Sequence, residues 1–244
     1  MSSLSAGEKR IKRKIFWDKL TFVLTAVFLA ICVLFSVTMI YQKTYFKLKW
    51  VNGQSMYPTF NKDAVTSTGE KKGIGGAGAN NGDKNFDCVI YDNHEQTMNK
   101  MERFDIVILR ETGTLNKDLI KRIIVMPGET FYFGKDDDNG TLYIKASNGE
   151  FAKVDQPIGE DYIKDGLYEN YQDPEHPTTL KNNEYFVCGD NRGHSSDSRS
   201  FGPVSFDQIE GLVVAVVGSC DATVDNSGAI TYKNLKIGWP RWIK

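Results

Sequence analysis

The sequence predicts a mainly β protein, with an antiparallel barrel or sandwich-type domain outside the membrane and one N-terminal transmembrane helix. Three observations support this prediction. One uncharged apolar run lies near the N-terminus, short β-branched runs separated by turn residues recur through residues 43–244, and no second segment has the length and periodicity of a helix. We therefore divide the chain into a basic tail (1–19), a membrane span (20–42) and a β-rich domain (43–244).

The predicted membrane span, Leu20–Gln42, contains no charged residue. As a helix it would extend about 34 Å, enough to cross a hydrocarbon core of roughly 30 Å. A buried core helix would carry polar residues at helical spacing, whereas the mildly polar residues of this run share no face. The run is also too long for the apolar part of a signal peptide, and Thr38–Gln42 has no small-x-small cleavage site. We expect the helix to remain as an anchor.

Charge around the span predicts its orientation. Six basic residues precede the span and three follow it closely: Lys9, Arg10, Lys12, Arg13, Lys14 and Lys19, then Lys43, Lys47 and Lys49. Because Lys and Arg collect on the cytoplasmic side, this predicts a single-pass protein of the cell membrane with a cytoplasmic N-terminus and an extracytoplasmic domain. Trp239 and Trp242, among basic residues, favour contact with membrane lipid; the alternative is that both fill the end of the barrel as core.

Composition and residue spacing argue against several other classes. Lys plus Arg number 30 and Asp plus Glu number 31, so the chain has no basic field for nucleic acid. One cysteine lies in the span, and the other three are too widely spaced to indicate a disulfide framework or a metal site: Cys88, Cys188 and Cys220. The three histidines are scattered as well. We expect no metal and no cofactor, and no feature indicates an obligatory protein partner.

The β-rich domain is predicted from runs that alternate or are rich in β-branched residues. These runs are residues 45–51, 88–91, 105–110, 119–126, 130–133, 141–145, 185–188 and 211–217. Two stretches interrupt the pattern. A Gly- and Asn-rich segment near 63–85 is expected to be a flexible surface insertion, and a charged region within 146–181 is expected to contain a long loop or small subdomain.

A candidate nucleophile, Ser55, lies in the stretch Gly53–Pro58. Gly53 permits a positive φ, while Pro58 fixes its own φ and stops a helix from continuing. Together they favour a rigid turn that exposes the Ser55 hydroxyl. On these residues alone, an ordinary turn with a solvated serine is an equally good interpretation.

A candidate base lies in the strongest predicted strand, Leu119–Met126. Since side chains alternate along a strand, Lys121 and Arg122 point to opposite faces, and one of them faces whatever the sheet covers. Burial disfavours the charged ammonium and can lower the pKa of a lysine by about 3–5 units, which makes a neutral amine available as a general base. Taken alone, Lys121 is better explained as an edge-strand lysine that prevents aggregation.

The third candidate stretch is the polar segment Gly189–Arg199, which directly follows an apolar strand. Its many hydrogen-bonding side chains indicate a constrained loop. In such a loop Asp197 and Arg199 could form a buried pair, and serine hydroxyls could orient the lysine amine. A solvated serine-rich loop is the alternative.

In this order, the Ser55 turn, the Lys121 strand and the Gly189–Arg199 loop resemble the motifs of bacterial type I signal peptidases, the Ser/Lys-dyad leader peptidases. Residues 103–108 resemble the strand that this family carries between its serine and lysine motifs. The resemblance extends over residues 51–203 and includes the N-terminal anchor. It implies a membrane-anchored serine endopeptidase that removes signal peptides from exported pre-proteins after a small-x-small sequence.

The resemblance also implies roles for individual residues. Ser55 would attack the scissile carbonyl, and neutral Lys121 would accept its proton and later activate the deacylating water. Ser195 would hold the lysine amine in place, and Asp197 and Arg199 would form a supporting pair. Three further residues of the loop would shape it and take no part in the chemistry: Asp190, Asn191 and Arg192.

Two further expectations concern the transition state and the substrate. The backbone N–H of Ser55 is expected to be one oxyanion donor; because Gly53 stands where some family members have a serine, the second donor stays open between a backbone N–H and a water. An extended pre-protein segment could add beside residues 47–51 and 118–121 as a strand. Its small side chains would enter shallow pockets formed by Val51, Met56, Phe60, Leu119 and Ile120, residues that could equally be core.

Two rival interpretations are less consistent with the sequence. Self-cleaving repressors combine a Ser/Lys dyad with a similar β fold, but they begin with a DNA-binding helical domain, whereas this chain has a membrane span. An inactive relative that assists assembly of surface structures would have lost the serine or the lysine, and both are present.

Overall fold

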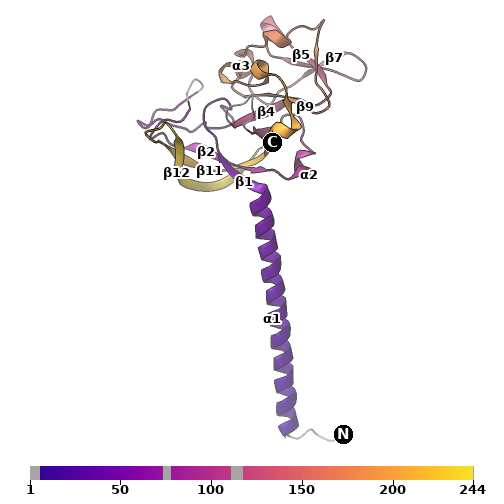
Figure 1. The fold of residues 1–244 in the computed structure, drawn as a ribbon, viewed down its shortest axis with the longest axis vertical. Helices are drawn as coiled ribbons and strands as arrows, with labels where there is room; N and C mark the ends of the chain where they lie inside the picture. Colours follow the sequence, from indigo (N-terminus) through magenta and orange to yellow (C-terminus); the bar gives the residue numbers. More distant parts are fainter. Residues whose placement is uncertain (1–5, 74–77, 111–117, 244) are drawn as a thin grey trace. The chain divides into compact units, whose positions relative to one another are not determined.

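The computed structural model describes residues 6–73, 78–110 and 118–243 (Figure 1). The chain forms two units, residues 1–45 and residues 46–244. The first unit is one long helix, α1 (Ala6–Tyr45), so the basic tail expected at 1–19 is helical from Ala6 onward. The second unit contains all the strands.

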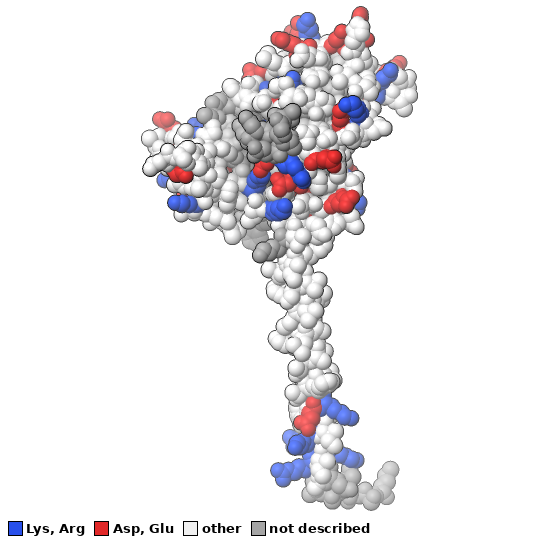
Figure 2. Space-filling model, viewed as in Figure 1, with Lys and Arg blue, Asp and Glu red and all other residues white. Residues whose placement is uncertain are grey.

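Within α1, residues 10–41 are long and apolar enough to cross a membrane. Figure 2 shows no charged side chain along the middle of α1, and basic side chains gathered near its N-terminal end. The hydroxyls of the span each donate to the carbonyl oxygen four residues earlier, at 2.8 Å: Thr21, Thr25, Ser36 and Thr38. The helix therefore satisfies these polar groups internally, as an apolar environment requires.

The second unit is built on a curled antiparallel sheet in the order β1-β2-β11-β3-β4-β9-β10, with β12 paired to β11. The strands are β1 (Phe46–Trp50), β2 (Phe86–Asp92), β3 (Ile106–Leu109), β4 (Leu119–Val125), β9 (Glu184–Cys188), β10 (Val204–Ser205), β11 (Ile209–Val224) and β12 (Ile230–Trp242). β11 pairs with β2 along one edge, and with β3 and then β12 along the other. β9 pairs with β4 only from Arg122 onward, so the first residues of β4 have β3 as their neighbouring strand.

A smaller antiparallel sheet has the order β7-β6-β5-β8. Its strands are β5 (Thr130–Phe133), β6 (Leu142–Lys145), β7 (Phe151–Val154) and β8 (Thr178–Thr179). The helices of this unit are short: α2 (Glu95–Met98), α3 (Glu160–Lys164), α4 (Ser198–Phe201) and the 3₁₀ turns η1 (Asp136–Asp138), η2 (Glu169–Tyr171), η3 (Arg192–His194) and η4 (Phe206–Gln208).

Apolar side chains join the two sheets and support the residues around Ser55. One cluster packs Phe131 and Phe133 of the small sheet against Phe186 of β9, all fully buried, with ring centroids 5.0 and 5.9 Å from that of Phe186. A second cluster lies under the Ser55 turn and includes Val51, Met56, Phe60, Ile106, Ile108 and Ile120. Each large apolar side chain buried in this way contributes about 1.5–3 kcal/mol to the stability of the fold.

The mainly antiparallel β fold predicted from the sequence is confirmed, and every predicted run contains an observed strand. Four strands were not predicted: β7, β8, β10 and β12. β12 contains Gly238 and Pro240 and is largely exposed, so it lacks the apolar alternation of a half-buried strand. It forms because β11 offers a long edge for pairing.

The described part of the 63–85 segment contains a buried ion pair. Lys72 donates to Asp83 Oδ2 at 2.7 Å, and both side chains are at least 96% buried. Burial opposes ionisation of Asp83, but bonds from Lys72 and the Asn80 N–H hold its pKa below the ordinary value. The sequence did not predict this ion pair, because a Gly- and Asn-rich composition gives no sign of it, and the flexible surface insertion stays a prediction.

Candidate active site

Ser55 lies in a tight turn between β1 and the core cluster beneath it. Gly53 has a φ of +90°, which glycine adopts without strain. The N–H of Tyr57 donates to the carbonyl of Gln54 at 3.0 Å, and this closes the turn around Ser55. The serine is half-buried, and among the described residues no hydrogen bond is donated by its backbone N–H. The turn predicted from Gly53 and Pro58 is therefore present.

Lys121 approaches the serine from β4. Its side chain is 2% exposed, and Nζ lies 3.0 Å from Ser55 Oγ and 3.0 Å from the carbonyl oxygen of Ile120. The 3.0 Å contact is within the range expected for a nucleophile and its base. The edge-strand alternative for Lys121 is excluded, because β4 lies inside the sheet and the amine faces the serine.

Arg122 points to the other face of β4 and is also buried. Its Nε and Nη2 donate to the two carboxylate oxygens of Asp190, at 2.8 and 2.7 Å. The hydroxyl of Thr59, four residues after the nucleophile, donates to the same carboxylate. Asp190 thus joins β4 to the end of the nucleophile turn, which is consistent with the shaping role expected for it.

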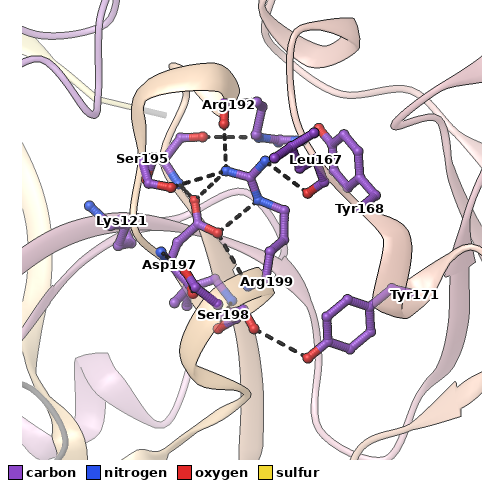
Figure 3. A network of polar contacts seen from close by, with 12 residues as sticks. Lys121, Leu167, Tyr168, Tyr171, Arg192, Ser195, Asp197, Ser198 and Arg199 are labelled. Atoms are coloured by element: carbon purple, nitrogen blue, oxygen red, sulfur yellow. Dashed lines mark hydrogen bonds and ion pairs between the residues drawn. The ribbon is translucent and has the colours of Figure 1, made fainter.

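Asp197 and Arg199 form the pair expected in the polar loop. Arg199 Nε and Nη2 donate to the carboxylate oxygens of Asp197 at 2.8 Å each, and the N–H of Gly189 donates to Asp197 Oδ2 at 2.9 Å. Figure 3 shows this pair at the centre of the polar network. Burial opposes ionisation of Asp197, but the bonds and charge of Arg199 outweigh burial, so the pKa of Asp197 lies below its ordinary value.

Ser195 lies at the site, although it does not bond to the amine in this structure. A Cβ added to Gly189 would collide with both Ser195 Oγ and the Ser55 carbonyl oxygen, so the two serines approach the same glycine. The Ser195 hydroxyl lies beside the Asp197 carboxylate and makes no hydrogen bond to Lys121 Nζ. The structure therefore places Ser195 near the dyad without the expected contact.

A cleft of about 430 Å³ opens beside the dyad, between β1, the nucleophile turn and the start of β4. Of the residues expected to form substrate pockets, Val51, Leu119 and Ile120 line this cleft. Met56 and Phe60 are each 1% exposed and belong to the core cluster underneath. They support the cleft from below and are not among its lining residues.

Three further residues shape the site: Asn191, which was expected only to shape its own loop, and Asn61 and Gln54, to which the sequence assigned no role. Asn191 donates from its backbone N–H to the Ser55 carbonyl and from Nδ2 to the Gln54 carbonyl, both at 3.0 Å. Asn61 bonds to carbonyls on the other side of the turn. Gln54 is 4% exposed and lines the cleft. These residues contact backbone groups that sequence patterns do not locate, and only the positions of Gln54 and Asn191 within motifs hinted at a role.

A family model described as "Signal peptidase, peptidase S26" matches residues 20–218. The chain belongs to this family. The resemblance inferred from the four sequence motifs is thereby confirmed.

Among the residues that the structure describes, no group of three or more His, Cys, Asp or Glu side chains has the geometry of a metal site.

Individual members of the signal peptidase family show the extent of the similarity. The chain is 36% identical over 115 residues to signal peptidase I V of Bacillus subtilis (strain 168), covering 46% of this chain and 64% of the relative. It is 32% identical over 154 residues to signal peptidase I S of the same organism, covering 62% and 64%. The chain thus spans about 64% of the length of these curated relatives.

A solved structure, signal peptidase I of Enterococcus faecalis V583, aligns at 31% identity with a TM-score of 0.33, covering 46% of this chain and 96% of that one.

Proposed function

We propose that this chain is a membrane-anchored serine endopeptidase that removes signal peptides from exported pre-proteins, with Ser55 as nucleophile and Lys121 as general base. The observation that carries this proposal is the 3.0 Å contact between Lys121 Nζ and Ser55 Oγ at the edge of a cleft. Membership of the signal peptidase family supports the reaction class.

In the acylation step, Ser55 Oγ attacks the scissile carbonyl carbon and its proton passes to neutral Lys121 Nζ. When the tetrahedral intermediate collapses, the carbon–nitrogen bond breaks and Lys121 returns the proton to the departing amine. Water then attacks the carbonyl carbon of the acyl-enzyme while Lys121 accepts its proton; the bond from that carbon to Ser55 Oγ breaks, and Lys121 returns the proton to Oγ. The same amine serves as base and acid, so the step needs no metal and no cofactor.

Burial of Lys121 and the pairing of the carboxylates of the site support a neutral amine. Lys121 is buried, and burial disfavours the ammonium ion. The buried carboxylates of the site, Asp190 and Asp197, are each paired with an arginine at 2.7–2.8 Å. Their negative charge is therefore largely compensated and stabilises an ammonium on Lys121 less than a lone carboxylate would.

The oxyanion is proposed to bind the backbone N–H of Ser55. This N–H makes no hydrogen bond within the described part of the chain, which leaves it available for an incoming ligand. The carbonyl of the same peptide group, Gln54 O, accepts bonds from Tyr57 N and Asn191 Nδ2, so the direction of the Ser55 N–H is set before substrate arrives. The second donor is not assigned.

The substrate is proposed to bind as an extended strand in the cleft between β1 and the start of β4. Leu119 and Ile120 precede the point at which β9 joins β4, and no strand in the described part of the chain pairs with this side of β4 there, which suits an added strand. The cleft wall formed by Val51, Leu119 and Ile120 is apolar and suits the small side chains of a small-x-small sequence.

We also propose that α1 anchors the protein with its N-terminus in the cytoplasm and residues 46–244 outside, in contact with membrane lipid. The apolar span and the excess of basic residues before it support this orientation. An N-terminal epitope tag that is accessible in intact protoplasts would contradict it.

The test of the activity is cleavage of a purified pre-protein by the full chain in detergent, with the cut site mapped by mass spectrometry. We expect a single cut after a small-x-small sequence, no cut by Ser55→Ala, and an unchanged cut by Ser147→Ala, which changes an exposed serine on the turn after β6. No cleavage by the unmodified chain, or equal cleavage by Ser55→Ala, would contradict the proposal.

A further inference from the structure

Asn61 is a buried asparagine, 1% exposed, six residues after the nucleophile. Its side chain uses both of its donors on the segment between β1 and Ser55: Nδ2 lies 2.8 Å from the carbonyl oxygen of Val51 and 2.8 Å from that of Gly53. Its Oδ1 accepts from the N–H of Asp87 on β2 at 2.9 Å, and its own N–H donates to Asp87 Oδ2 at 2.8 Å. Asn61 therefore ties the chain before Ser55 to a central part of the sheet.

The backbone conformation of Asn61 suits only a few residue types. Its φ is +59°, in the left-handed region that asparagine and glycine tolerate and most other residues avoid. The same geometry turns the chain so that the amide reaches back over the nucleophile turn to Val51 and Gly53. The asparagine is thus matched to this position by both its backbone and its side chain.

Fixing a carbonyl fixes its whole peptide plane, because the peptide bond is planar and trans. Asn61 holds the Gly53 carbonyl, which sets the plane of the Gly53–Gln54 peptide. Asn191 holds the next carbonyl, Gln54 O, which sets the plane that carries the Ser55 N–H. The two asparagines therefore orient consecutive peptide groups directly before the serine.

We propose that Asn61 is a positioning residue for Ser55: it fixes the peptide before the nucleophile, so that the serine hydroxyl and its N–H face the substrate carbonyl in attack geometry. This inference rests on the proposed function, since it assigns a role within the same reaction. Asn61 bonds to the backbone carbonyls of Val51 and Gly53, two residues that line the cleft, so its effect on Ser55 passes through the backbone of the turn.

Asp87 and Arg241 help to hold Asn61 in place from the solvent side of the turn. Arg241 of β12 donates from Nη1 to the Thr59 carbonyl at 3.1 Å and from Nη2 to Asp87 Oδ2 at 3.4 Å. The Arg241–Asp87 pair is partly exposed, so it contributes much less to the stability of the turn than the buried hydrogen bonds of Asn61 do. We therefore expect Arg241→Ala to lower the turnover rate far less than loss of the Asn61 amide.

The test measures cleavage by the full chain in detergent with Asn61→Gly and Asn61→Asp. Glycine keeps the positive φ and removes the amide, while aspartate keeps the shape and loses both donors. A misplaced nucleophile costs on the order of 10²-fold, so we expect kcat to fall by about that factor while KM changes by less than about 3-fold. Asn234→Gly is the matched control, because Asn234 also has a positive φ, of 56°, but is exposed on β12. Its kcat is expected to match that of the unmodified chain.

A kcat for Asn61→Gly within about 3-fold of the unmodified chain would overturn the inference. So would a loss of rate that disappears after correction for the folded fraction, since that is a purely structural role. If Asn61→Gly is unfolded at the assay temperature, Asn61→Asp is assayed below its own Tm instead. A kcat within about 3-fold of the unmodified chain, or a loss of rate explained by the folded fraction alone, would then overturn the inference. Failure of the unmodified chain to cleave would instead count against the proposed function.

Discussion

The buried guanidinium of Arg122 and the carboxylate of Asp190 form an ion pair with two hydrogen bonds, on the face of β4 opposite Lys121. The pair joins β4, which carries the candidate base, to the polar loop and, through Thr59, to the nucleophile turn. It therefore holds together the three sequence motifs that together identified the family.

Removing one partner of this pair is expected to destabilise the protein strongly. Asp190→Ala leaves a buried guanidinium without its counter-charge, and such a loss typically costs about 3–5 kcal/mol. The double variant Arg122→Met with Asp190→Leu removes both charges of the pair. Its free energy of unfolding should therefore fall by less than that of Asp190→Ala. Urea unfolding of the three proteins measures the difference, and a double variant that is less stable than Asp190→Ala would contradict this account.

The Asp197–Arg199 pair predicts a specific loss of stability in acid. A carboxyl whose pKa is lower in the folded protein adds stability above its unfolded pKa, near 3.8, and that stability is lost as the pH falls through the folded value. We expect the free energy of unfolding to decrease below about pH 4, and Asp197→Asn to flatten this part of the curve. Asp137→Asn is the control, since Asp137 is exposed on η1. An unchanged acid slope in Asp197→Asn would count against the pairing.

The cysteines of the second unit should be unreactive in the folded protein. Burial raises the pKa of the Cys88 thiol to about 11, and that of Cys188 and Cys220 to about 12. Since the thiolate is the reactive form, these thiols should not react at pH 8. A Cys32→Ser variant should react with a thiol reagent only after denaturation, then at three sites, and should keep its activity after exposure to the reagent. Rapid labelling of one thiol in the native state would contradict this.

The exposed tryptophans of β12 predict a contact between this strand and membrane lipid. The alternative that Trp239 and Trp242 fill the core is wrong, because they are 97% and 70% exposed on β12, next to Ile237 at 80%. Indoles among Lys and Arg suit the headgroup region of an anionic membrane. In proteoliposomes containing anionic lipid, Trp239→Ala with Trp242→Ala should slow cleavage of a membrane-inserted pre-protein and leave cleavage of a soluble peptide unchanged. Equal rates on the membrane-inserted substrate would show that these residues make no functional contact with lipid.

The sequence predicted the parts of the site that depend on residue type and order. Ser55 and Lys121 could be paired because their motifs occur in a family order, although each alone had an equal or better ordinary explanation. The Asp197–Arg199 pair was predicted for the same reason. The fold class followed from β-branched runs such as β4, which is rich in Ile and Val and buried on both faces.

Other features depend on contacts that no local pattern encodes. β12 forms because β11 continues beyond β3 and offers an edge, and its own residues are mostly exposed. Asn61 acts through the carbonyls of Val51 and Gly53, and its partner Asp87 is 26 residues away in sequence. Met56 and Phe60 are apolar and close to Ser55, but the pleat and turn direct them into the core and away from the cleft.

The most direct test of the central claim is the rate of pre-protein cleavage by Lys121→Arg, measured in single turnover with the full chain in detergent. An arginine keeps much of the length of the lysine, but its guanidinium stays protonated and cannot accept the Ser55 proton. If Lys121 is the base for Ser55, this variant should be as inactive as Ser55→Ala while unfolding at a similar urea concentration. Cleavage by folded Lys121→Arg at the rate of the unmodified chain would contradict the Ser55–Lys121 dyad.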